Sequence, residues 1–154
     1  RIKRALDIDQ TSVRFLSVDK QQQFQRFFLI RDYLEDKQTE IDDWNRAMLN
    51  GDAAAAAVNS RRMTNLGVFR AYLVQYLRSN PKLRQDMSLI VRQLSPSPTG
   101  LPIEIYCFTD TTAWVEYEAI QSDIFDHVLA ILPEFGLRLF QQPSGRDLQA
   151  LRME

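Results

Sequence analysis

The stretch GLPIEIYCFTDTTAWVEYEAIQSDIFDHVLAILPEFGLRLFQQP, residues 100–143, decides the fold. Residues 101–109 place aliphatic side chains at every second position, which predicts a half-buried strand. Between residues 112 and about 135 the apolar side chains recur with the helical period, so a long amphipathic helix follows, and Gly136 stops it. Residues 137–142 predict a second strand. Nothing in the stretch resembles a catalytic motif.

The composition bounds the class of protein. A chain of 154 residues suits one domain with a sizeable core. Its formal net charge of -1 gives no long-range attraction to nucleic acid or to an acidic membrane surface, so neither is expected as a direct partner. The single cysteine suits a reducing cytoplasm. No apolar run approaches the ~20 residues of a spanning helix, and the sequence lacks an initiator Met, so we expect a soluble piece of a longer protein.

Two further strands are predicted outside the opening stretch. Residues 1–9 alternate as a strand, although Arg4 interrupts its apolar face. Residues 87–94 form another, and the proline-rich turn 95–100 connects it to the strand 101–109, so antiparallel pairing of these two is expected. The side chains expected to point inward from the first and third strands are Ile2, Leu6, Ile8, Leu101, Ile103, Ile105 and Cys107.

A long helix is predicted after the first strand. Ser17 or Asp19 caps it, it runs to about Leu49, and residues 50–51 stop it before the alanine run 53–57, to which we assign no chemistry. Two interpretations stay open: an amphipathic helix that packs on its own core, which we prefer, or a coiled-coil contact with a second copy. Heptad positions a and d hold Phe27, Ile30, Leu34, Ile41, Trp44 and Met48.

Thr64 or Asn65 caps a second predicted helix, which Asn80 and Pro81 end. Its apolar stripe is Leu66, Phe69, Leu73, Tyr76 and Leu77.

The order of elements predicts an α+β fold. Without the insertion 10–60 it is βαββαβ, a ferredoxin-like sandwich with a four-stranded antiparallel sheet and two helices on one face. We expect one domain over residues 1–145 and a tail over 146–154. The opposite face of the sheet would be open, and its apolar area suggests that it is covered in the working molecule. That open face would carry Ile90, Arg92, Tyr106, Phe108 and Phe140.

Reactive groups are sparse, so we predict no catalytic residue, no cofactor and no metal. One histidine and one cysteine do not make a zinc site. His127 is expected at a helix boundary, bonded to Asp123 or to solvent. Cys107 is expected as a small buried hydrophobe. No glycine-rich phosphate loop is present.

A competing hypothesis uses the same strand differently. Tyr106 and Phe108 stand two residues apart, as do base-stacking aromatics in sheet RNA-binding domains. The strand lacks the basic start and the glycine of that motif, and burial against a neighbouring subunit explains the two residues more simply. A ligand- or RNA-binding module is therefore the alternative. A small acyl phosphatase is a distant third, because a fold alone carries no chemistry.

Several runs of sequence resemble one family. Residues 61–70 (RRMTNLGVFR), 91–94 (VRQL), 100–106 (GLPIEIY) and 117–127 (YEAIQSDIFDH), together with 1–6 (RIKRAL), are similar to the cytoplasmic end of bacterial small-conductance mechanosensitive channels, miniconductance branch. The resemblance covers the first strand and about residues 60–145.

The resemblance implies a channel component rather than an enzyme. Such channels are homo-heptamers of the inner membrane that open under tension in hypoosmotic shock. A βαββαβ domain builds their hollow cytoplasmic cage, whose portals filter solutes, and ions are the permeants. Membrane segments would precede residue 1. Ordinary members lack the inserted helix. The tail is charged and lacks a β-branched run, so the strand that closes their cage as a small barrel is not carried over to it.

We therefore predict two contact surfaces with the body of the domain or with neighbouring copies. The inserted helix would contribute Phe27, Leu34, Ile41 and Trp44. The open sheet face would contribute Ile90, Tyr106, Phe108 and Phe140.

Overall fold

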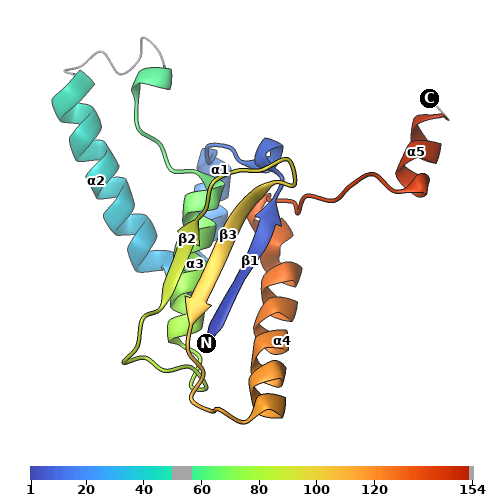
Figure 1. The fold of residues 1–154 in the computed structure, drawn as a ribbon. Coiled ribbons are helices and arrows are strands. Elements are labelled where there is room, and N and C mark those ends of the chain that lie inside the picture. Colours follow the sequence, from blue (N-terminus) through green and yellow to red (C-terminus); the bar gives the residue numbers. More distant parts are fainter. Residues whose placement is uncertain (50–56, 153–154) are drawn as a thin grey trace.

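The computed structural model describes residues 1–49 and 57–152, which form the predicted α+β architecture (Figure 1). Its strands are β1 (Ile2–Ile8), β2 (Ile90–Gln93) and β3 (Leu101–Cys107). Its helices are α1 (Val18–Phe24), α2 (Arg31–Leu49), α3 (Asn65–Arg78), α4 (Trp114–Ile131) and α5 (Gly145–Leu151). Short 3-10 turns lie at Gln10–Ser12, Phe28–Ile30, Ala57–Asn59 and Leu132–Phe135.

The strand β3 is the centre of an antiparallel sheet with the order β1-β3-β2. It pairs with all of β1, ending with Leu101 opposite Ile8. Its pairing with β2 is shorter and begins with Tyr106 opposite Ile90. The predicted antiparallel pairing across the proline-rich turn is confirmed, although β2 begins at Ile90 rather than at Met87.

The closing strand predicted over residues 137–142 is reduced to a single bridge. Leu139 forms an isolated antiparallel bridge with Ile8, on the edge of β1 that β3 leaves free. Pro143 has no N–H with which to extend a ladder, and the chain turns away from the sheet after it (Figure 1). The described sheet therefore has three strands rather than the predicted four.

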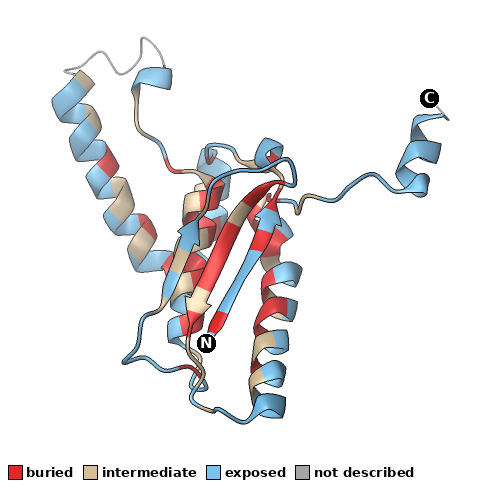
Figure 2. Ribbon diagram, viewed as in Figure 1, coloured by how far each residue is buried: buried red, intermediate tan, exposed pale blue. Residues whose placement is uncertain are grey.

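Helices α3 and α4 cover one face of the sheet (Figure 1), and buried positions are concentrated on β1, on β3 and on these two helices, whereas β2 has none (Figure 2). The guanidinium carbon of Arg4 lies 4.3 Å from the centroid of the Phe125 ring on α4, so a cation–π contact accommodates the charge that interrupts the apolar face of β1. The strand residues predicted to point inward are all buried, namely Ile2, Leu6, Ile8, Leu101, Ile103, Ile105 and Cys107.

The insertion contains two helices, so the single helix predicted over residues 19–49 is wrong. α1 ends at Phe24, and the turn Phe28–Ile30 precedes α2. This turn packs against α3 and buries Ile30 completely. A straight helix projecting from the body would leave that side chain in solvent, which accounts for the break. The predicted stop and most of the alanine run, residues 50–56, lie outside the described residues.

Phe135 joins the insertion to the body. Its ring centroid lies 5.2 Å from that of Phe24 and 5.8 Å from that of Phe27, both in the insertion. It also lies 5.3 Å from the centroids of Phe69 and Tyr72 on α3. These five rings, the Phe135 cluster, connect three segments that are distant in sequence, and tilted aromatic pairs of this kind are each favourable by about 0.5–1.5 kcal/mol beyond their burial.

Helix ends follow the sequence in three of four cases. The side chains of Ser17 and Thr64 cap α1 and α3 as predicted, each accepting a hydrogen bond from the backbone N–H three residues on. α4 differs. The sequence offers Asp110, Thr111 or Thr112 as its cap, but Ala113 occupies the cap position, and the Thr111 hydroxyl oxygen accepts from the N–H of Ala113 (3.1 Å). Gly136, with φ of 68°, ends the turn after α4 as predicted, in a conformation that glycine adopts without strain.

Residues 141–152 extend away from the body and carry α5 (Figure 1). All of them are exposed. Ser144 caps the helix, and the Asp147 carboxylate accepts from the backbone N–H of Ser144 in return, which completes a capping box. We call residues 141–152 the α5 arm.

Candidate subunit interface

The open face of the sheet is organised in rows that cross the strands. Side chains directly opposite one another on one face are in contact range, so each row acts as a unit. Two rows span all three strands: Lys3, Tyr106 and Ile90, then Ala5, Glu104 and Arg92. Phe108 lies beyond the first of these rows and Phe140 beyond the second, so Phe108 and Phe140 are about 20 Å apart along the strand.

One end of this face is aromatic. The rings of Tyr106 and Phe108 meet edge to face with centroids 5.5 Å apart, and both residues are half-buried. The guanidinium carbon of Arg1 lies 5.9 Å from the Tyr106 centroid. Ile90 completes the group and is 46% exposed. We call Ile90, Tyr106 and Phe108 the aromatic end.

Phe140 occupies the other end of the face. It lies over Gly100, where φ is 115° and a Cβ atom would come within 2.9 Å of the Ile8 carbonyl oxygen and 3.0 Å of the Phe140 Cβ. Glycine is therefore required at the point where Phe140 crosses the start of β3.

An ion pair separates the two apolar ends. The Nε of Arg92 donates to Oε1 of Glu104 over 2.9 Å, and its Nη2 lies 2.8 Å from the same oxygen. The Glu104 side chain is only 8% exposed although it stands on the open face. The apolar surface expected from the sequence is therefore divided, with a buried and paired carboxylate in its middle.

This geometry gives little support to base stacking. The RNA-binding alternative requires Tyr106 and Phe108 to be freely exposed, whereas each is half-buried and the two rings contact each other edge to face.

The insertion buries most of its predicted contact residues within its own chain. Phe27 is half-buried in the Phe135 cluster, and Leu34 and Ile41 are each 3% exposed. Trp44 differs, because it is 36% exposed. The preferred interpretation, a helix packed on its own core, accounts for Leu34 and Ile41, and Trp44 remains available for a partner.

The segment that returns from the insertion is tied to α2. The Asn45 amide donates to the Arg61 carbonyl over 3.1 Å and accepts from the Arg61 N–H over 2.8 Å. The Arg61 guanidinium binds Glu40 over 3.0 Å and lies 5.7 Å from the Trp44 ring centroid. The hydrogen bond from Arg61, followed by that from Lys37, holds the pKa of Glu40 below its usual value.

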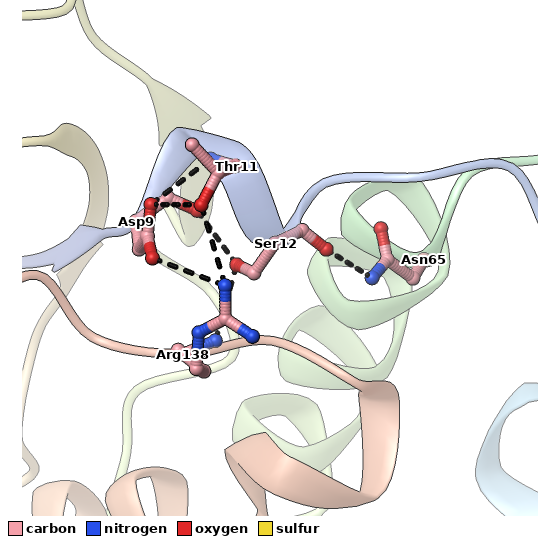
Figure 3. A network of polar contacts seen from close by, with 5 residues as sticks. All are labelled: Asp9, Thr11, Ser12, Asn65 and Arg138. Carbon is pink, nitrogen blue, oxygen red and sulfur yellow. Dashed lines mark hydrogen bonds and ion pairs between the residues drawn. The ribbon is translucent and has the colours of Figure 1, made fainter. Parts of the chain in front are cut away.

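A buried polar network fixes the start of the insertion (Figure 3). The Asn65 amide donates to the Ser12 carbonyl and accepts from the Arg14 N–H, both over 2.9 Å. The Ser12 hydroxyl donates to the Asp9 carbonyl over 2.6 Å and accepts from the Arg138 N–H over 3.1 Å. The sequence marks Asn65 only as a candidate helix cap, because no local signal relates it to a residue 53 positions away.

The partner of His127 is Tyr72, not Asp123 or solvent as expected. The Tyr72 hydroxyl and the His127 Nε2 are 2.7 Å apart, which links α3 to α4. The His127 ring also stacks on Tyr76, with centroids 4.3 Å apart. Burial raises the pKa of both tyrosines, so their hydroxyl groups stay protonated. These aromatic partners lie on a different helix, which explains why the local sequence suggested Asp123.

Cys107 is fully buried, and burial raises the pKa of its thiol to about 11, in agreement with the predicted structural role. Within residues 1–49 and 57–152, no three His, Cys, Asp or Glu side chains are grouped closely enough to hold a metal ion. In the same part of the chain, no helix combines the length and apolarity needed to cross a bilayer.

The fold defines a class: an α+β domain with helices on one face of an antiparallel sheet, an open opposite face and an exposed C-terminal arm. Comparison with known proteins specifies the class further. The family model described as the C-terminal region of the mechanosensitive ion channel MscS matches residues 57–139. The chain therefore belongs to the MscS family of mechanosensitive ion channels, as the resemblance predicted, and this is a family of channels rather than of enzymes.

A characterised relative agrees with this assignment. The chain is 31% identical over 71 residues to the low conductance mechanosensitive channel YnaI of Escherichia coli strain K12. The match covers 46% of this chain and 21% of the relative, so the chain spans about a fifth of the length of this relative.

Proposed function

We propose that this chain is the cytoplasmic cage domain of a bacterial inner-membrane channel that opens under membrane tension in hypoosmotic stress. It acts in subunit assembly, in solute filtering and in the modulation of gating, and the working molecule is a homo-heptamer whose membrane segments precede residue 1. The match of residues 57–139 to the MscS C-terminal family carries the proposal.

The arrangement of the strands supports a ferredoxin-like domain over residues 1–145, with the insertion at 10–60. The bridge between Leu139 and Ile8 places the last segment beside β1. A fourth strand of a βαββαβ sheet would occupy the same edge, so we propose that residues 137–142 are a shortened form of that strand.

The aromatic end of the open face is our candidate for contact with the next subunit. Ile90 is 46% exposed beside two half-buried aromatic rings. Interfaces concentrate their binding energy in such apolar and aromatic groups, and a charged pair at the margin of the contact adds specificity. The ion pair between Arg92 and Glu104 stands where it would mark that margin.

The full-length channel provides the test. Expressed in a bacterium without tension-gated channels, it should restore survival after hypoosmotic shock and give tension-activated currents in membrane patches. Ile90→Asp should weaken the assembly on native gels and reduce survival, whereas Val58→Asp, at a residue that is 85% exposed and lies in the insertion, should do neither. Failure to restore survival or current in the unsubstituted channel rejects the function. Normal assembly, threshold and conductance in Ile90→Asp reject the interface alone.

The insertion is proposed to contact a neighbour through Trp44. Trp44→Asp should change the opening threshold or the cross-linking pattern while leaving the fold intact, because this side chain is partly exposed. Ile41→Asp is the matched variant that destabilises α2 itself, because Ile41 is buried. If Trp44→Asp has the unsubstituted threshold, conductance and cross-links, the insertion has no such contact.

A further inference from the structure

The helix α5 is exposed at every residue, so it packs on no other part of the described chain. It has 7 residues, and a helix of that length is not stable alone in water. Leu148 and Leu151, three residues apart and therefore on one side of the helix, are 54% and 70% exposed. The arm therefore presents an apolar edge that a partner surface would stabilise.

A matching hollow lies at the end of α4 and in the segment that follows it. Its volume is about 330 Å³, and Leu129 at its margin is 38% exposed. Its apolar lining is Leu129, Leu132, Pro133, Leu137 and Leu139. A cavity of this size accepts one or two leucine side chains.

The arm of the same chain is badly placed to fill this hollow. Gln141 lines the hollow itself, and α5 begins only four residues later, at Gly145. Pro143 restricts the residue before it to extended conformations, so the chain continues outward instead of turning back. Figure 1 shows α5 standing clear of the sheet and of the other helices. A second copy presents the same helix without this constraint.

Charge complements the fit. Arg146 and Arg152 on the arm form no ion pair within the described part of the chain. Glu134 is exposed and directly follows Pro133 in the lining of the hollow. Arg138 also lines the hollow, and its guanidinium is paired with Asp9 over 3.3 Å. A docked α5 would place an arginine within reach of this carboxylate, and such a pair at a rim favours one orientation of the helix.

We propose that α5 of one copy docks into the hollow of the neighbouring copy, with Leu148 and Leu151 against Leu129. The proposal rests on the homo-oligomer proposed above. Each copy gives one arm and receives one, and a head-to-tail contact of this kind forms a ring when the rotation between copies closes. Two leucines are a small contact, which suffices because the other interfaces already hold the copies together and raise the effective concentration of the arm.

Cross-linking of the full-length channel tests the docking. Two differently tagged copies are co-expressed, one with Leu129→Cys and the other with Leu148→Cys, and treated with a short bismaleimide. The buried Cys107 does not compete. We expect a product that carries both tags, and several-fold less product when Gln149→Cys, one residue along the same helix, replaces Leu148→Cys. Native mass spectrometry of the same samples reports the oligomer.

The outcomes are distinguishable. A two-tag product that depends on residue 148 supports the docking. An intact oligomer without that product, or with equal product from residue 149, overturns the docking and leaves the proposed function standing. A product found only when both cysteines are in one copy assigns the hollow to the arm of the same chain and also overturns it. A monomer in every sample overturns the proposed assembly itself.

Discussion

Replacing Asn65 by alanine tests how the insertion is held to the body. The amide makes two hydrogen bonds of 2.9 Å, one to the Ser12 carbonyl and one from the Arg14 N–H. Ser12 is 0% exposed and Asn65 is 2% exposed, so water does not easily replace the lost partner at the carbonyl.

The magnitude follows from the two groups left behind. An unsatisfied buried polar group costs about 1–3 kcal/mol. The buried Ser12 carbonyl loses its partner without replacement, so the full penalty applies to it. Arg14 is exposed, so its N–H can donate to water instead, which offsets part of the penalty. We therefore expect Asn65→Ala to lower the free energy of unfolding by about 2–4 kcal/mol, a large part of the ~5–15 kcal/mol of an ordinary domain.

Urea unfolding followed by circular dichroism measures this change. With a slope of about 2 kcal/mol per M, the midpoint should fall by about 1–2 M without a change in slope. Asn80→Ala is the control, because that side chain accepts one exposed hydrogen bond, from the Lys82 N–H over 2.9 Å. A loss in Asn65→Ala below about 1 kcal/mol, or no larger than in Asn80→Ala, refutes the assigned role of the network.

Three further predictions use the same unfolding measurement. Tyr72→Phe removes the hydroxyl that contacts His127 and should cost about 1 kcal/mol, and an unchanged midpoint would contradict this. Gly100→Ala should lower the free energy of unfolding by more than about 2 kcal/mol, because Gly100 has a φ of 115° and the Ile8 carbonyl lies close to it. Gly145→Ala is the control and should be nearly neutral, because open space surrounds that residue. Equal effects of the two substitutions would contradict the strain assigned to position 100. Hydrogen bonds from Thr11, and then from Arg138, lower the pKa of Asp9. The stability that the ionised Asp9 carboxylate contributes is therefore present above its ordinary pKa and is lost as pH falls through the lower pKa of the folded state. Asp9→Asn should flatten the fall in stability below about pH 4, and an acid profile identical to that of the unsubstituted protein would refute this role of Asp9.

Much of the fold follows from local periodicity. The burial of β1 and β3 and the extents of α3 and α4 agree with the sequence, because each element has one apolar side and a clear terminator such as Gly136. The prediction of a closing strand over residues 137–142 was wrong because the apolar alternation there is short and Pro143 has no N–H with which to continue the ladder. Alternation shows which side of a segment is apolar, but not whether its backbone is paired.

The contacts that hold the insertion are long-range and have no local signature. The turn after Phe24 forms because Ile30 and the Phe135 cluster find partners on α3 and after α4, and helical periodicity continues through it unchanged. At the candidate interface the sequence placed Tyr106 and Phe108 on the open face. It did not show that the Arg92 and Glu104 pair divides that face, since register between strands depends on tertiary pairing.

The break before α2 gives the insertion the properties of a lever. With 19 residues, α2 is about 28 Å long, and the turn Phe28–Ile30 stands at its base. A rotation of about 10° at that turn moves the far end of the helix by about 5 Å while the side chains at the turn move by a fraction of this. A small displacement of the Phe135 cluster would therefore produce a larger displacement at the far end of α2. In the other direction, a partner bound at Trp44 would apply its force to the cluster through the length of the helix.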